Sequence, residues 1–256
     1  GKELDTIKVQ DIIGDLGSNF NSVNDILSTL NSTRSIDDYT YSHSINVSLL
    51  SGLIAKWLNL GEKECRLIAY CGLLHDIGKS KISPEILSKP SPLTLEEFKE
   101  IKKHPILGYE ILANNIAINK NVATGVLMHH EREDGSGYPL SLKSNKIHPY
   151  AKIVAIADVF DAMTSDKVYK CKQTPFDVFR IYESEYLTKF DTNILLTFLN
   201  RIASFYIGNN VKLNTQETGE IIFINHKYIS KPMVKLDNSR IVDLSKDPSL
   251  SIVEIL

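Results

Sequence analysis

The sequence is poor in cysteine, and its few cysteines argue against two kinds of protein. Its 256 residues contain three, Cys65, Cys71 and Cys171, and no two of them form a CxxC pair. An odd number without such pairs argues against a disulfide-stapled fold and against a structural zinc site. Because no signal-peptide pattern is present either, the sequence predicts a reducing, cytoplasmic location.

The sequence also lacks strong net charge and long apolar runs. A net charge of −2 gives no reason to expect a nucleic-acid polymer as partner, although a local cluster of cations can still bind a small anion. No apolar run reaches the length of a membrane span, so we expect no membrane contact by this segment. The chain begins at Gly1 without Met, which leaves open an upstream sensor or receiver domain. A homodimer is left open as well.

The pattern of apolar residues predicts a mainly α fold. Up to about Tyr206 they recur at three- and four-residue steps, and a capping box of Thr94 and Glu97 starts one helix. The expected helices cover residues 38–58, 62–75, 116–129, 150–164, 174–187 and 191–206, and another begins at His104. Short strands are expected at 211–213, 220–225, 233–236 and 252–255. We therefore expect N-terminal helices (1–37), a helical domain (38–207) and a small β-rich C-terminal appendage (208–256).

Four of these helices carry a histidine or aspartate on the stripe that should face the interior. The stripes are His43 with Val47, Leu50 and Ile54; His75 with Ile68 and Gly72; His129 with Val122 and Val126; and Asp158 and Asp161 with Val154. One such residue is usually a hydrogen-bonded part of the core. Burying several imidazoles and carboxylates together costs free energy unless a cation compensates. The pattern therefore predicts that these side chains converge on metal ions.

Two short segments concentrate residues that bind metals or transfer protons. His75–Lys79 reads HDIGK, and His129–Pro139 reads HHEREDGSGYP. Both start at an expected helix end, where the backbone turns and neighbouring side chains can serve two ions. His104 adds an imidazole at a helix start, whereas His148 and His226 fall outside the pattern and are interpreted as ordinary residues.

Two acidic residues of the second segment have two interpretations each. Glu131 can orient a neighbouring histidine or support the glycine-rich loop that follows. Asp134 can cap that loop or brace it. The sequence does not separate these roles.

In this order the motifs resemble the HD-GYP family, a branch of the HD-domain metal phosphohydrolases. The similarity covers residues 39–170 and consists of YTYSHS (39–44), LLHDIGK (73–79), ILSKPSPLT (86–94), HPILGYEIL (104–112), the HHE and DGSGYP block, and DVFDAMTSDKVYK (158–170). An HD pair alone is weak evidence, but HHE, DGSGYP and DxxDAMTS together are specific. The resemblance implies an HD-domain helical bundle that binds two or three metal ions. It also implies hydrolysis of cyclic di-GMP, a bacterial signalling nucleotide, to pGpG, GMP or both.

The resemblance implies seven metal ligands, with Asp76 as the bridging carboxylate: His43, His75, Asp76, His104, His129, His130 and Asp158. Family members with three metals carry a glutamate four residues before the first histidine, and this chain has Tyr39 there. We therefore expect two divalent ions rather than three. Mixed imidazole and carboxylate ligands favour iron or manganese, and less specifically zinc or nickel.

The resemblance also implies a set of substrate-binding residues: Lys79, Tyr138, Asp161, Lys167 and Lys170. Lys79 would neutralise the phosphate or assist departure of the 3′ oxygen, which makes it catalytic together with Asp76. Lys167 stands where an arginine is usual; lysine keeps the charge but lacks the bidentate fork that matches a phosphate.

The expected reaction is attack on the phosphodiester by a hydroxide that bridges the two metals, because metal ions lower the pKa of bound water to about 7. One alternative is a catalytically weak or inactive cyclic di-GMP-binding sensor module, which only Tyr39 and Lys167 favour. The other is an HD-type phosphohydrolase acting on different nucleotides, against which the complete DGSGYP block argues. The presence of all seven expected ligands favours the enzyme.

Overall fold

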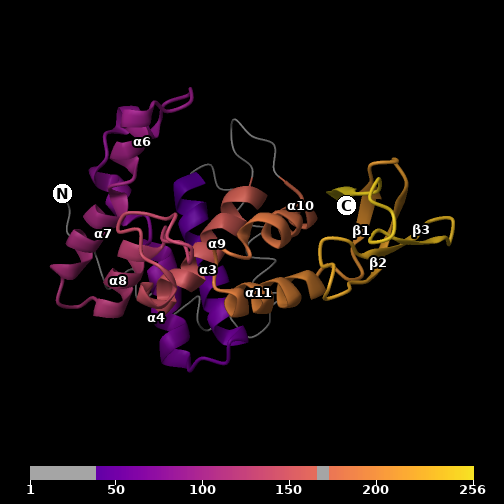
Figure 1. The fold of residues 1–256 in the computed structure, drawn as a ribbon, viewed down its shortest axis with the longest axis horizontal. Coiled ribbons are helices and arrows are strands. Elements are labelled where there is room, and N and C mark those ends of the chain that lie inside the picture. The colour runs from indigo at the N-terminus through magenta and orange to yellow at the C-terminus, as the bar shows by residue number, and fades with distance from the viewer. Residues whose placement is uncertain (1–38, 166–172) are drawn as a thin grey trace. The chain divides into compact units, whose positions relative to one another are not determined.

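The computed structural model describes residues 39–165 and 173–256 (Figure 1). The chain divides into two compact units, Gly1–Asp161 with Lys189–Asp191, and Ala162–Thr188 with Thr192–Leu256. The helices expected within residues 1–37, and also Lys167 and Lys170, lie outside the described residues.

The first unit is helical, as the apolar periodicity predicts. Its elements in chain order are α3 (Tyr39–Trp57), α4 (Glu62–Leu74), the 3₁₀ turn η1 (Ile77–Lys81), α5 (Pro84–Leu87), α6 (Leu95–Ile101), α7 (His104–Ala113), α8 (Lys120–Met128), the 3₁₀ turn η2 (Ser144–Lys146) and α9 (Pro149–Thr164). None of the helices in the described ranges has the length and apolar character needed to cross a membrane.

The helix starts follow from local capping. The capping box of α6 is confirmed: Thr94 Oγ1 accepts from the Glu97 amide at 3.2 Å, and Glu97 Oε2 accepts from the Thr94 amide at 2.7 Å. The helix expected from residue 116 starts later, at Lys120, because the Asn119 side chain caps it. Its predicted first residue, Ile116, lies fully exposed.

The core of the first unit is built from the stripes that the sequence predicts. Val47, Leu50 and Ile54 of α3 and Ile68 of α4 are each at most 1% exposed. Burial of such a side chain contributes about 1.5–3 kcal/mol. Helices α3 and α4 lie against each other, and the close approach is possible because Gly72 has no side chain: a Cβ there would lie 2.8 Å from the Val47 carbonyl oxygen.

A second close approach joins the HDIGK turn to the start of α7. A Cβ on Gly78 would lie 1.9 Å from the carbonyl oxygen of His104 and 2.5 Å from the Gly108 amide nitrogen. Only a residue without a side chain fits between η1 and α7. This contact places His104 beside Asp76, which precedes η1 directly.

The second unit combines helices with a small antiparallel sheet. It contains α10 (Pro175–Ile181), a π-helical turn (Tyr182–Tyr186), α11 (Thr192–Ser204), β1 (Asn210–Leu213), β2 (Thr218–Phe223), β3 (Met233–Leu236), β4 (Ile241–Asp243) and β5 (Ile252–Ile255). The strand order is β4-β3-β2-β1-β5. Buried Val211, Ile221 and Val234 line one face of three neighbouring strands. The mainly α fold with a C-terminal β part is therefore confirmed.

Two features of this unit differ from the sequence prediction. The helix expected over 174–187 is α-helical only to Ile181. Beyond it, Glu183 accepts hydrogen bonds from the Ile229 amide at 2.8 Å and from the Ser230 hydroxyl, partners too distant in sequence for periodicity to reveal. The compact unit also groups α10 and α11 with the strands, whereas the change of pattern near residue 208 suggests a separate appendage.

We expect Gly78→Ala to lower the free energy of unfolding by about 1–3 kcal/mol, because the added methyl forces η1 away from α7. Urea denaturation measures the change. Gly61→Ala is the matched control: Gly61 precedes α4 with φ −65°, and a Cβ at this position would meet no atom within 4 Å. Equal stability of the two variants would contradict this account of the packing.

Candidate metal centre

The structure brings together all seven side chains that the sequence names as metal ligands. His43 comes from α3, and Asp158 comes from α9. The others sit at helix ends: His75 and Asp76 after α4, His104 at the start of α7, and His129 and His130 after α8. Six of them are at most 8% exposed, and His130 is half-buried. Their function as ligands stays a prediction, but their convergence is a feature of the fold.

One group of potential ligand atoms lies between α3, α4 and α9. His43, His75 and Asp76 each offer an atom within 4.8 Å of the others. Asp158 Oδ1 is 3.2 Å from His43 Nε2 and 3.8 Å from His75 Nε2. This group combines two imidazoles with two carboxylates.

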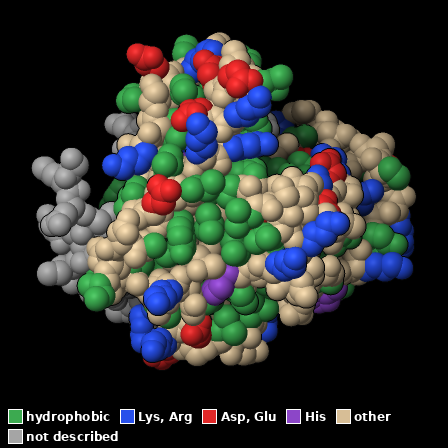
Figure 2. Space-filling view, turned by 60° about the vertical axis from the view of Figure 1, so that its left-hand side comes forward, with side chains coloured by type: hydrophobic (Ala, Val, Ile, Leu, Met, Phe, Trp, Pro, Cys, Tyr) green, Lys and Arg blue, Asp and Glu red, His purple; other side chains and the backbone are tan. Residues whose placement is uncertain are grey.

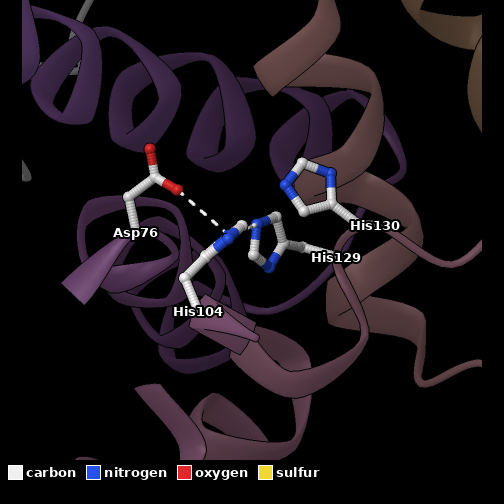
Figure 3. Close-up of side chains that lie close together, drawn as sticks. All are labelled: Asp76, His104, His129 and His130. Atoms are coloured by element: carbon white, nitrogen blue, oxygen red, sulfur yellow. Dashed lines mark hydrogen bonds and ion pairs between the residues drawn. The ribbon is translucent and has the colours of Figure 1, made fainter. Parts of the chain in front are cut away.

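A second group lies next to it and contains three imidazoles. Asp76, His104, His129 and His130 offer atoms within 4.8 Å of one another (Figure 3). His104 Nε2 is 3.3 Å from Asp76 Oδ1 and also 3.3 Å from His129 Nε2. Because Asp76 belongs to both groups, the arrangement suits a carboxylate shared between two ions.

The two oxygens of Asp76 face different groups. Oδ2 lies 3.2 Å from His75 Nε2 and 4.0 Å from His43 Nε2, whereas Oδ1 faces His104. Lys79 Nζ also donates a hydrogen bond to Asp76 Oδ2 at 2.6 Å, and the lysine side chain is 35% exposed. The position of Asp76 therefore agrees with the bridging role that the family resemblance implies.

Three of the histidines are held in one tautomer by the helix ends. The Nδ1 atoms of His75, His104 and His129 lie 2.7–2.8 Å from carbonyl oxygens three residues earlier, each in the last turn of a helix. Such carbonyls have no partner within their helix, and they can only accept, so each Nδ1 must donate. In the neutral ring, Nε2 then carries a lone pair directed into the cluster.

Burial keeps most of these rings neutral. Desolvation lowers the pKa of His104, holds the pKa of His129 well below its usual range, and lowers the pKa of His130 to about 3. Two Nε2 lone pairs, those of His104 and His129, therefore face each other at 3.3 Å with no proton between them. A cation between them removes this repulsion.

Unpaired buried atoms also fit a metal. Within the described part of the chain, His75 Nε2 and Asp76 Oδ1 are fully buried and make no aligned hydrogen bond. Leaving such an atom unsatisfied costs about 1–3 kcal/mol. Both atoms point into the two groups, so bound cations would satisfy them. The residues present thus fit metal ions, and the donor set of imidazoles and carboxylates suits a divalent transition metal.

His43 is held by a pair of side chains behind it. Its Nδ1 lies 2.7 Å from Asp161 Oδ2, and the Asn46 amide donates to Asp161 Oδ1 at 2.9 Å. Burial disfavours the charged ring, but Asp158 and Asp161 outweigh it and raise the pKa of His43 to about 9. Asp161 is only 2% exposed, so the structure places this expected substrate residue against a histidine. Asn46 escaped the sequence prediction, although it lies one turn after His43.

The glycine-rich loop is fixed by Glu131. Its two oxygens accept from the amides of Leu140 and Leu142 at 2.6 and 2.8 Å. These contacts favour support of the loop, rather than orientation of a histidine, as the role of Glu131. Asp134 braces the same loop by accepting from the amide and hydroxyl of Ser136. The Tyr138 ring lies stacked on His130, with centroids 4.6 Å apart.

The remaining histidines lie outside the cluster, as expected. His148 Nδ1 accepts from the Tyr150 amide at 3.2 Å, and His226 Nδ1 lies 2.6 Å from Asn200 Oδ1. Neither belongs to a group of potential metal ligands among the described residues.

The fold and the His/Asp cluster define an HD-domain protein: the model of that family matches residues 22–194, more than half of the chain, and the chain belongs to it. The HDIGK, HHE and DGSGYP motifs resemble those of the HD-GYP branch of this family.

Known relatives support this placement. A cyclic di-GMP phosphodiesterase of Pseudomonas aeruginosa is 31% identical over 236 residues, covering 92% of this chain and 57% of that protein. Another from Thermotoga maritima is 42% identical over 161 residues, covering 62% and 43%. The chain thus spans about half the length of these relatives. The solved structure of an HDG"Y"P protein from Bdellovibrio bacteriovorus shares the fold, with a TM-score of 0.56 at 18% identity, covering 76% of this chain and 69% of that one.

We predict that Asp76→Asn loses bound metal from both groups, because the shared carboxylate becomes a neutral amide that binds cations weakly. Elemental analysis of purified protein measures the metal content. Asp243→Asn, in the second unit, is the control and should keep the wild-type content. Unchanged metal in Asp76→Asn would show that Asp76 is not a ligand.

We predict that Glu131→Gln loosens the loop, since the amide group of glutamine turns a donor toward either the Leu140 or the Leu142 amide. Loss of one such hydrogen bond costs about 1–3 kcal/mol, so exchange of these two amides with solvent should quicken about tenfold or more. Hydrogen exchange followed by mass spectrometry detects this. Exposed Glu110→Gln on α7 serves as the control, and equal exchange in both variants contradicts the assignment.

Proposed function

We propose that this chain is a metal-dependent phosphodiesterase that hydrolyses cyclic di-GMP to pGpG, GMP or both. The observation that carries the proposal is the pair of ligand groups that share Asp76. The substrate class is supported by the names of the relatives. Because the chain spans about half of those proteins, the proposal concerns the part of the protein that carries the motifs.

His43, His75, Asp76 and Asp158 would hold one divalent ion, and Asp76, His104, His129 and His130 would hold the second. The ligand set favours iron or manganese. Two such ions supply an activated water and neutralise charge on the phosphate. The chain contributes the preorganisation: helix-end carbonyls orient three imidazoles, and Asp161 orients His43.

Lys79 is the catalytic partner of Asp76 in this proposal. Its ammonium bonds to Asp76 Oδ2 and remains one-third exposed, so it lies between the buried cluster and solvent. From there it can turn to a phosphate oxygen or deliver a proton to the departing 3′ oxygen. A lysine at this position would therefore neutralise the negative charge that develops on the departing 3′ oxygen as its bond to phosphorus breaks.

The other substrate residues follow from the family motif. The stacking of Tyr138 on His130 supports a position beside the bound substrate. The hydrogen bond from His43 to Asp161 supports an indirect contribution of that carboxylate. Lys167 and Lys170 remain predictions, as do a cytoplasmic location, a homodimer, an upstream sensor or receiver domain, and the choice of two ions over three that Tyr39 suggests.

We predict that Lys79→Met lowers kcat for cyclic di-GMP about 100-fold or more while metal content stays at the wild-type level, since its contribution is to charge and proton transfer rather than metal binding. Chromatography of products from metal-loaded protein measures the rate. Lys81→Met, exposed on the same 3₁₀ turn, is the matched control. Normal turnover by Lys79→Met would remove Lys79 from the mechanism.

The sensor-module alternative is favoured by Tyr39 and Lys167, and one sample separates it from the enzyme. The dissociation constant and the turnover of cyclic di-GMP are measured on the same metal-loaded protein. Tight binding without turnover supports the sensor. Hydrolysis of other nucleotides with cyclic di-GMP left intact would instead support a different phosphohydrolase activity.

A further inference from the structure

Lys102 lies beside the candidate metal centre and belongs to none of the motifs that predicted it. It caps the C-terminus of α6 and is half-buried. Its ammonium lies 4.7 Å from the centre of the Phe98 ring and 5.2 Å from the centre of the Tyr138 ring. Because Tyr138 is itself stacked on His130, a single aromatic ring separates Lys102 from a candidate metal ligand.

Within the part of the chain that the structure describes, Lys102 forms no ion pair with a carboxylate, unlike the lysines around it. Acidic and basic side chains are interspersed on the face of the molecule shown in Figure 2. On α6 and just after it, Lys99 pairs with Glu96 and Lys103 pairs with Glu100. At the cluster, Lys79 pairs with Asp76. No ion pair among the described residues includes Lys102, and the described contacts of its ammonium are with two aromatic rings.

Aromatic contacts hold a lysine in place without neutralising it. A cation over an aromatic face is attracted by the electrons of the ring, and this attraction favours one position of the side chain. An ammonium also forms stronger, charge-assisted hydrogen bonds with an anionic oxygen when one is available. Phe98 and Tyr138 thus keep a positive charge ready at the edge of the centre.

We propose that Lys102 binds the second phosphate of a cyclic dinucleotide, the one that is not cleaved. This inference rests on the proposed function, because such a substrate carries two phosphodiester groups. One phosphate would lie at the ligand groups with Lys79, and Lys102 would supply a cation for the other, in addition to the lysines at 167 and 170 that the family motif names. Among the described lysines, Lys102 contacts the ring of Tyr138 in the glycine-rich loop and forms no ion pair with a carboxylate.

The test compares two substrates on the full chain. Cyclic di-GMP has two phosphates, whereas bis(p-nitrophenyl) phosphate has one. Lys102→Met should raise the dissociation constant of metal-depleted protein for cyclic di-GMP about tenfold or more, and should raise KM similarly in metal-loaded protein. Hydrolysis of bis(p-nitrophenyl) phosphate should stay within about twofold of wild type. Calorimetry and steady-state kinetics give the two readouts.

Two variants serve as controls. Lys102→Arg keeps the charge and the stacking on aromatic rings, and should bind cyclic di-GMP within about threefold of wild type. Lys99→Met removes an exposed, paired lysine from the same helix and should change neither substrate. Melting temperatures of all variants establish that they fold.

Two results overturn the inference: wild-type affinity of Lys102→Met for cyclic di-GMP, or an equal loss with both substrates, which would indicate that Lys102 only supports Tyr138. Failure of the proposed function is a different result, visible in the wild type. A wild-type protein that cleaves bis(p-nitrophenyl) phosphate but neither binds nor cleaves cyclic di-GMP refutes the proposed substrate, and the assigned ligand of Lys102 with it.

Discussion

The candidate metal centre depends on what stabilises the lone pairs of its buried imidazole nitrogens and carboxylate oxygens. His104 and His129 direct Nε2 atoms at each other across 3.3 Å, and burial keeps both rings neutral. Asp76 and Asp158 add buried negative charge. Despite burial, His75 and Lys79 hold the pKa of Asp76 well below its usual range, and the hydrogen bond to His43 does the same for Asp158. Acceptors gathered in this way repel one another unless cations lie between them. The cluster is therefore best explained as a site for metal ions.

The scaffold achieves this arrangement with ordinary features of helices. A helix ends with carbonyls that lack partners, and a histidine placed there satisfies one of them through Nδ1. That single bond fixes both the tautomer and the direction of Nε2. Gly78 then allows η1 to approach α7, so that ligands from separate helix ends meet. Local sequence thus determines the chemistry of each ring, and close packing of glycines brings the rings together.

Much of this could be predicted from the sequence because the signals are local or periodic. The stripes of α3, α4, α8 and α9 identify the buried face, and the capping box identifies the start of α6. Contacts between distant residues could not be predicted. Sequence spacing does not show that Asp161 is hydrogen-bonded to His43, or that Glu131 accepts from the amide of Leu140. Nor does it show that the ammonium of Lys102 lies over the Tyr138 ring. Strand β4 was missed because three residues are too short for an alternating pattern.

The most direct test of the account is the number of metal ions per wild-type chain. Protein purified without oxygen and analysed by elemental mass spectrometry should contain about two transition-metal ions per chain, as expected for a shared carboxylate between two sites. Anomalous scattering from crystals of that protein should locate them on either side of Asp76. Protein that folds normally with no bound metal, or with metal bound away from Asp76, would contradict the account.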